Sequence, residues 1–436
     1  MLPHQLQISN GIRLHWLFDD RFKTNHLTVQ FLVPLAADTV SGYALLLSVL
    51  GHGCERYPTL RLLNEALAEL YAASVTTRVQ KRGECQVLSF DVSFLDNAFV
   101  PDDTDVFGGT LEVLKEIIFH PLVKDGAFDP QIVSLEQKNM CDAIRAQINN
   151  KTIYAYKQGI KEMCRNEAYG LDENGTIEGI EKLTPKDLYT YYQMLLQSAP
   201  VEIYYVGRME MEQFLAHLGH AFEAQTRGTL FVPSTQVVRH AQAPVHRVTQ
   251  DMPVNQGKLT VGFRTGKVLG DADYYKLSVM NEIFGGSPSS RLFMNVREKL
   301  SLCYYCSSST EALKGLMTVI SGVENEKKEE AEAEILRQLH ALQTTQVTQE
   351  ELENAKRSLC NAYREISDDA ASMIAWYSQR VLAGVPCSFE QAIGQIQSVT
   401  PQDVLEAARA VSLDTVYFLH AAKGTVANDE EEKTDG

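Results

Sequence analysis

The sequence predicts an α+β fold made of two homologous domains, each with helices packed on a mainly antiparallel sheet. Three observations lead to this prediction. The chain has 436 residues, 44% of them hydrophobic, which is more than a single core usually accommodates. Short segments recur in the same order more than 200 residues later, which indicates duplicated domains. Each copy also contains both strand-like and helix-like hydrophobic patterns.

Each copy opens its matching part with a half-buried strand. Leu27–Phe31 (LTVQF) returns 232 residues later as Leu259–Phe263 (LTVGF), and apolar residues alternate in both. A helix follows, because Arg61–Leu63 matches Arg291–Phe293 and the apolar residues over 62–70 have the spacing of one helix face.

A hairpin and further helices continue the pattern in both copies. The expected turns contain Gly83 in the first copy and Gly315 in the second, each between strand-like segments. Downstream, Glu112–Ile118 and Glu330–Leu339 have the pattern of amphipathic helices.

The sharpest match between the copies is a helix start. Thr184–Leu188 (TPKDL) returns as Thr400–Val404 (TPQDV), and Thr can cap free N–H groups while Pro loses nothing at the first helical position. Each copy then closes with a strand, Val201–Val206 in the first and Thr415–Leu419 in the second.

These landmarks predict the domain organisation. We expect a first domain over residues 1–225, with a last helix at Phe214–Phe222, and a second domain over 246–425. The polar, breaker-containing segment 226–245 is the expected linker. The acidic residues 426–436 offer almost nothing apolar to bury, so we expect a disordered tail.

The composition disfavours several classes of partner. The 40 basic against 56 acidic residues give a net charge of −16, which repels nucleic acid and anionic lipid. No apolar stretch has the length of a membrane helix, and no signal-peptide pattern opens the chain. Eight scattered cysteines are typical of reduced, mostly buried thiols. We therefore expect a cytoplasmic protein that binds neither nucleic acid nor membrane.

Two groups of metal-like residues do not predict a metal site. His217, His220 and Glu223 are spaced by three, so they do not converge on a helix as residues four apart do. Cys303 and Cys306 form a lone C-x-x-C in an expected strand, where positions three apart face opposite ways. Buried thiols are the interpretation that follows.

A longer motif carries a resemblance to a known family. Arg291–Tyr304 (RLFMNVREKLSLCY) resembles the second-domain motif of the insulinase, pitrilysin and mitochondrial processing peptidase family, whose subunits contain two such α+β domains, and the resemblance covers nearly the whole chain. It implies that Arg297 and Tyr304 act on the scissile peptide held by a zinc-bearing domain, where a guanidinium and a phenol suit an oxyanion. The alternative is a solvated helix arginine and a packed strand tyrosine. The first copy holds Leu67 and Ser74 at these positions.

The resemblance also shows what is missing. Active members carry an H-x-x-E-H zinc motif in the first domain, and this sequence has none. Ala44, Leu47 and Ser48 stand where His, Glu and His are expected, and Ala143 stands at the position of the third, glutamate ligand. We therefore expect no metal and no other cofactor in this chain.

A short glycine loop is the expected substrate-binding element. Gly285, Gly286 and Ser287 occupy a position similar to that of the glycine-rich substrate loop in the non-catalytic subunit of mitochondrial processing peptidase, although this loop is much shorter. A plain helix-ending turn is the open alternative.

Together these expectations describe a non-catalytic subunit of a heterodimeric zinc metallopeptidase. Its partners would be a zinc-bearing paralogous subunit and a peptide substrate. Phe22–Asn25 and Glu69–Ser74 resemble zinc-less bacterial members associated with elongation factor P 5-aminopentanol modification. Two alternatives stay open: a purely structural subunit, like the core proteins of respiratory complex III, and a stand-alone metallopeptidase with unrecognised zinc ligands.

Overall fold

The computed structural model describes residues 2–218, 222 and 227–421, and the acidic segment expected to be a disordered tail lies outside them. The chain forms two compact units, each built from three segments of the sequence. Unit 1 comprises Met1–Arg145, Leu171–Thr235 and Arg364–Phe389. Unit 2 comprises Ala146–Gly170, Gln236–Tyr363 and Glu390–Gly436.

Unit 1 contains a six-stranded sheet in the order β1-β2-β8-β3-β5-β4. Neighbouring strands are antiparallel except for β2 and β8, which are parallel. The strands are β1 (His4–Ser9), β2 (Ile12–Phe18), β3 (Thr24–Pro34), β4 (Ser74–Arg82), β5 (Cys85–Leu95) and β8 (Val201–Gly207).

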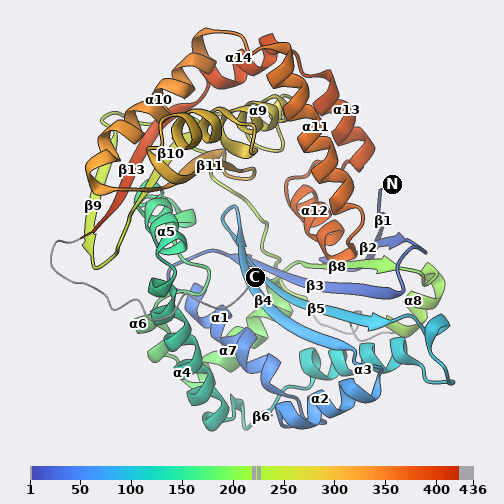
Figure 1. Ribbon diagram of the computed structural model, residues 1–436. Helices are drawn as coiled ribbons and strands as arrows, with labels where there is room; N and C mark the ends of the chain where they lie inside the picture. Colours follow the sequence, from blue (N-terminus) through green and yellow to red (C-terminus); the bar gives the residue numbers. More distant parts are fainter. Residues whose placement is uncertain (1, 219–221, 223–226, 422–436) are drawn as a thin grey trace. The chain divides into compact units, whose positions relative to one another are not determined.

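Helices cover both faces of this sheet (Figure 1). Leu27, Val29 and Phe31 of β3 belong to the core that the sheet shares with α1, α3 and α7. The alternate residues of β3, such as Thr28 and Gln30, face α12 instead, as the two-residue period of a strand requires. The unit's helices are α1 (Val40–His52), α2 (Leu60–Glu69), α3 (Val106–Phe119), α4 (Pro130–Ala146), α6 (Ile177–Glu181), α7 (Pro185–Ser198), α8 (Met211–Leu218) and α12 (Ala370–Leu382), beside a short pair β6 (Val123–Lys124) and β7 (Ala127–Phe128).

Unit 2 repeats this sheet with five strands in the order β11-β12-β10-β13-β9. The order matches β4-β5-β3-β8-β2 of unit 1, and its single parallel pair, β9 with β13, corresponds to β2 with β8. The α+β fold class and the duplication predicted from the sequence are confirmed. The strands are β9 (His246–Met252), β10 (Gly257–Arg264), β11 (Cys303–Glu311), β12 (Leu316–Val323) and β13 (Ser412–Ala421).

The helices of unit 2 also lie on both faces of its sheet. Those on one face, α9, α10 and α14, share a core with Leu259, Val261 and Phe263 of β10, whereas α5 packs on the other face against β10 and β13. The helices are α5 (Lys151–Met163), α9 (Tyr274–Asn281), α10 (Lys328–Thr344), α11 (Gln349–Ile366), α13 (Phe389–Ser398) and α14 (Pro401–Arg409), with wide-turn helices at Glu282–Gly286 and Leu292–Lys299.

Each sequence repeat contributes one helix to the unit formed mainly by the other repeat. Helix α5 lies early in the sequence yet belongs to unit 2, and α12 lies late yet belongs to unit 1. The two units are therefore not consecutive stretches of the chain.

Both predicted helix starts form capping boxes. The backbone N–H of Asp187 donates to Thr184 Oγ1 (3.2 Å), and the N–H of Thr184 donates back to the Asp187 carboxylate (2.9 Å). Thr400 and Asp403 make the same pair of bonds at 3.2 and 2.8 Å. These reciprocal bonds satisfy N–H groups that a helix start otherwise leaves free.

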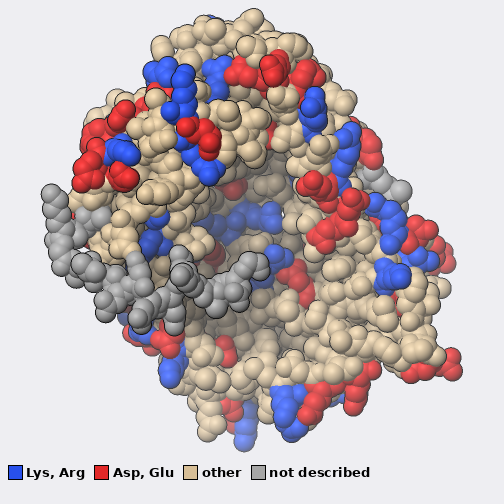
Figure 2. Space-filling view, viewed as in Figure 1, with Lys and Arg blue, Asp and Glu red and all other residues tan. Residues whose placement is uncertain are grey.

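The remaining sequence expectations can be placed. Gly83 and Gly315 occupy the hairpin turns with φ of +56° and +69°, where glycine avoids the strain of a side chain. Seven cysteines are buried and Cys387 is partly exposed. Among the described residues, no helix combines the length and the apolar composition needed to cross a bilayer. Basic and acidic side chains are interspersed on the face shown in Figure 2.

Candidate functional site

A π-helical segment positions Arg297 in unit 2. In Leu292–Lys299 the turns are wider than in an α-helix, and the N–H of Leu300 donates to the carbonyl of Asn295, five residues back (3.2 Å). Such turns are rare and recur at functional sites. Leu292 and Val296 are buried and anchor the segment, while Arg297 points to the surface with 41% of its side chain exposed.

The charge of Arg297 is only weakly compensated. Its Nε lies 3.5 Å from the carboxylate of Glu298, which is itself 50% exposed, and exposed pairs of this kind contribute little. The guanidinium also lies 4.6 Å from the ring centre of Phe293, which holds it by a cation–π contact. The planar group is therefore oriented and open to a ligand.

A β-bulge displays Tyr304. In β11, Cys303 pairs with Val323 and Tyr305 pairs with Gly322, so Tyr304 is an extra residue without a partner on β12. The side chain is 64% exposed, whereas the hydroxyl of Tyr305 shares a 3.0 Å hydrogen bond with that of Thr152. Bulges commonly re-aim a side chain beside an active site.

The connection between Arg297 and Tyr304 is short and strained. Ser301 has φ of +49°, a left-handed conformation that costs a non-glycine residue about 1–2 kcal/mol. Met294 and Leu300 are exposed large apolar residues on either side of Arg297. Together with Arg297 and Tyr304, they expose apolar area beside one cation and one phenol within a short stretch of the chain.

The predicted glycine loop packs against the strand that carries Tyr304. A Cβ on Gly285 would lie 2.6 Å from Ser308 Oγ and 2.8 Å from the Ser308 backbone nitrogen on β11, so only glycine fits there. A Cβ on Gly286 would lie 2.6 Å from a carboxylate oxygen of Glu282, and the Ser287 hydroxyl donates to the Glu282 carbonyl (3.4 Å). This gives Gly285 a packing role; substrate binding by the loop stays a prediction.

The positions aligned with the zinc motif do not fit a zinc ion. Ala44 and Leu47 are buried in the apolar core of unit 1 and Ser48 is partly buried beside them on α1, while Ala143 is exposed on α4. Alanine and leucine have no donor atom for a metal. Within the described residues, no group of three or more His, Cys, Asp or Glu side chains could hold a metal ion.

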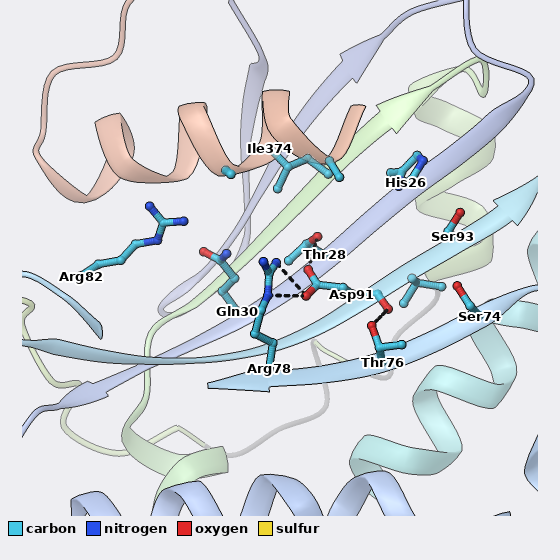
Figure 3. A pocket seen from close by; sticks show the side chains of 13 residues that line it. His26, Thr28, Gln30, Ser74, Thr76, Arg78, Arg82, Asp91, Ser93 and Ile374 are labelled. Carbon is cyan, nitrogen blue, oxygen red and sulfur yellow. Dashed lines mark hydrogen bonds and ion pairs between the residues drawn. The ribbon is translucent and has the colours of Figure 1, made fainter. Parts of the chain in front are cut away.

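Unit 1 contains a polar pocket that sequence reasoning missed. A cavity of about 150 Å³ lies between β3, β4, β5 and α12 (Figure 3). On its floor Arg78 pairs with Asp91 (2.8 Å), which also accepts a hydrogen bond from Thr28 (2.9 Å). Burial lowers the pKa of His26 at its edge. The only sequence signal was the polar residue at every second position of β3.

A second cavity of about 140 Å³ adjoins the same face of the sheet. The buried carboxylate of Glu202 lies 2.7 Å from Nε2 of His15 and accepts hydrogen bonds from the guanidinium of Arg13. The guanidinium of Arg13, 46% exposed, supplies a counter-charge to this buried carboxylate. Charged side chains on the walls of both cavities are therefore paired with each other within the sheet.

The cysteine pair and the histidine cluster considered in the sequence differ in how the structure places them. The prediction that Cys303 and Cys306 face opposite ways is wrong, because the bulge at Tyr304 adds one residue and turns both thiols into the same core. His217 lies 3.8 Å from the carboxylate of Asp105, and its former companions His220 and Glu223 lie outside the described residues.

Comparison with known proteins assigns the family. Residues 182–359 match the model described as Peptidase M16 inactive domain. Over 95% of its length the chain is 32% identical to the probable inactive metalloprotease YmfF of Bacillus subtilis (strain 168), and it covers 97% of that protein. The chain belongs to the peptidase M16 family. The resemblance to insulinase and its relatives is thereby confirmed, and the match to the inactive domain fits a chain without zinc.

Solved structures agree with the M16 fold. A conserved protein from Enterococcus faecalis V583 superposes with a TM-score of 0.89 at 27% identity, covering 98% of this chain and 100% of that one. The peptidase M16 inactive domain from Pseudomonas fluorescens gives 0.79 at 17% identity, covering 96% and 98%. The second likeness concerns the fold alone.

Proposed function

We propose that this M16 chain is the non-catalytic subunit of a heterodimeric zinc metallopeptidase. It binds an extended peptide and supplies Arg297 and Tyr304 to the active site of a zinc-bearing paralogous partner. The observation that carries the proposal is the display of a weakly paired guanidinium and a bulged, 64% exposed phenol by a chain that has Ala44, Ser48 and Ala143 at the zinc-ligand positions.

The two side chains suit the charge that develops in peptide hydrolysis. Attack on a peptide carbonyl places negative charge on its oxygen, and a metal ion in the partner would polarise that carbonyl. The phenol O–H of Tyr304 can donate one hydrogen bond to the oxygen, and the guanidinium of Arg297 can donate to the oxygen or to a neighbouring carbonyl. Neither group needs to change its protonation state.

The position of Tyr304 supports recognition of an extended peptide. β11 is an edge strand of its sheet, so one side of its backbone is not paired with another strand of the described sheet. Such an edge can accept a peptide as an additional strand. Met294 and Leu300 add exposed apolar contacts for its side chains.

The test requires a partner that carries the missing motif. The chain is co-expressed with an M16 protein that contains H-x-x-E-H and is encoded in the same genome, first of all by an adjacent gene. Complex formation is measured by size-exclusion chromatography with light scattering. Cleavage of a mixed peptide library is followed by mass spectrometry, and we expect activity from the pair and none from either chain alone.

Two substitutions then test the assigned residues. Arg297→Ala and Tyr304→Phe should each lower turnover by about 10²–10³-fold, the usual effect of losing an oxyanion donor, while the complex still forms. Arg337→Ala, an exposed arginine of α10, and Tyr305→Phe, which loses only the bond to Thr152, are matched controls with unchanged turnover.

Two results would overturn the proposal. Unchanged turnover in both Arg297→Ala and Tyr304→Phe would leave a scaffold subunit. Stoichiometric zinc in the purified chain by elemental analysis, together with peptidase activity without any partner, would instead establish a stand-alone metallopeptidase.

A further inference from the structure

The bulge at Tyr304 brings two thiols together. A regular strand would place Cys303 and Cys306 on opposite faces, but the extra residue between the Cys303↔Val323 and Tyr305↔Gly322 pairs restores a common face. Both side chains are buried in the core of unit 2, and a hydrogen bond links the two thiols. Cys303 is the less deeply buried of the two.

The surroundings of the pair shift the pKa values of the two thiols in opposite directions. The hydrogen bond from Cys306 lowers the pKa of Cys303 to about 7 against the opposing effect of burial, with help from Ser321 and the charge of Arg297. The same bond and burial raise the pKa of Cys306 well above its ordinary value. Burial also raises the pKa of the neighbouring Tyr305, with smaller contributions from the two cysteines.

This environment differs from that of other cysteines in the chain. Burial raises the pKa of Cys54, Cys85 and Cys141, for Cys85 to about 12. Thiolates are the reactive form, so those thiols are poorly placed to react. A thiolate beside a second thiol can form a disulfide after oxidation, because the neighbouring thiol attacks the sulfenic acid.

We propose that Cys303 and Cys306 form an oxidative modification site, which a hydroperoxide converts into an intrachain disulfide. With hydrogen peroxide, the Cys303 thiolate attacks one oxygen, the S–O bond forms, the O–O bond breaks, and the departing hydroxide takes up a proton to become water. The Cys306 sulfur then attacks the sulfenic sulfur, the S–S bond forms, and the S–O oxygen leaves as a second water with the Cys306 proton. Two thiols are oxidised and one peroxide is reduced.

The disulfide would restrict the backbone at Tyr304, the residue that the bulge exposes. Tyr304 lies between the two cysteines, so a disulfide closes a small ring around the bulge and fixes the backbone that carries the phenol. An effect on peptide cleavage rests on the proposed function, whereas formation of the disulfide does not. The experiment is therefore done on the isolated chain, without a partner.

The experiment treats the native chain with hydrogen peroxide at pH 7, quenches it with acid, and alkylates the remaining thiols under denaturing conditions. We expect the peptide that contains both cysteines to be lighter by two hydrogen atoms and unalkylated, the other six cysteines to be alkylated, and dithiothreitol to reverse the change. Full alkylation of both residues, or earlier oxidation of another cysteine, would overturn the proposal.

Variants separate the two steps. In Cys306→Ser the sulfenic acid has no resolving thiol, so dimedone should label Cys303, and Cys387→Ser, at a partly exposed cysteine, should form the disulfide like the native chain. A measurement on the native chain needs no substitution: the rate of iodoacetamide alkylation at Cys303 should be half-maximal near pH 7. A rate that rises only above pH 9 would contradict the assignment even if the variants failed to fold.

Discussion

The carboxylate of Glu167 lies 2.6 Å from Nη2 of Arg264, and both side chains are buried within unit 2. The ammonium group of Lys314, with 0% of its side chain exposed, lies 2.6 Å from the other carboxylate oxygen. Burial opposes the charge of Glu167, but the hydrogen bonds from Arg264 and Lys314 outweigh it and lower its pKa. These ion pairs fasten the segment 146–170, which carries α5, to the sheet of unit 2.

Glu167→Gln should destabilise unit 2 by about 3–5 kcal/mol, because it removes the buried carboxylate charge that pairs with Lys314 and that pairs, beside Asp414, with Arg264. The measurement is the urea midpoint of unfolding. Glu162→Gln is the control, since Glu162 pairs with His246 at a partly exposed position (2.9 Å) and should change stability by less than about 1 kcal/mol. Equal effects of the two substitutions would show that the buried pairs do not anchor the segment.

Acid should weaken the helix start at Thr400. The pKa of Asp403 falls to about 2, because hydrogen bonds from Lys276 and Thr400 outweigh the opposing effect of burial. Since the folded pKa lies below the unfolded value of about 3.9, the contribution is present above pH ~4 and is lost as the pH falls towards 2.

Asp403→Asn tests this pH dependence. The substitution should cost about 1 kcal/mol at pH 7, the usual size of a cap, and the difference from the native chain should shrink as the pH falls from 5 to 2. A difference that stays constant over this range would mean that the carboxylate charge is not responsible.

Two glycines of unit 2 should respond oppositely to alanine. Gly285→Ala forces a methyl group against the Ser308 backbone and should cost about 1–3 kcal/mol. Gly394 lies inside α13 with nothing within 4 Å of the added carbon, so Gly394→Ala should stabilise by up to about 1 kcal/mol. Thermal unfolding of both variants measures this, and destabilisation by both would contradict the packing argument.

Because α12 belongs to unit 1 but comes late in the sequence, an N-terminal fragment should fold incompletely. Residues 1–235 alone lack α12, which covers the polar face of the sheet in unit 1, so this fragment should unfold without cooperativity in a urea titration. Addition of a peptide spanning residues 364–389 should restore a cooperative transition. A cooperative fragment that is insensitive to the peptide would show that α12 is dispensable for unit 1.

Much of the fold could be predicted because the repeat is carried by local signals. Thr184 and Thr400 specify caps, Gly83 and Gly315 specify turns, and alternating residues specify strands, all through interactions within a few residues. The exchange of α5 and α12 could not be predicted. Both are amphipathic helices, and periodicity shows which face of a helix is buried without showing the sheet that buries it.

The candidate site was predictable only through a resemblance. The Arg297 and Tyr304 pair depends on a family motif, and its role in catalysis stays a prediction. The bulge that displays Tyr304 and joins Cys303 to Cys306 leaves no mark in the sequence, because it is set by the register of β11 against β12. The pocket beside Arg78 likewise depends on long-range pairing of three strands with α12.

The placement of α12 also dictates an order of events on the ribosome. Strand β3 ends at Pro34, but the helix that covers one of its faces ends at Leu382, so residues 236–363 of unit 2 must be translated before that face is protected. Domains usually fold as they emerge, starting from the N-terminus. Here the first sheet keeps one face uncovered while the segment between β3 and α12 is synthesised, and unit 1 is completed only after residues 236–363 of unit 2 have emerged.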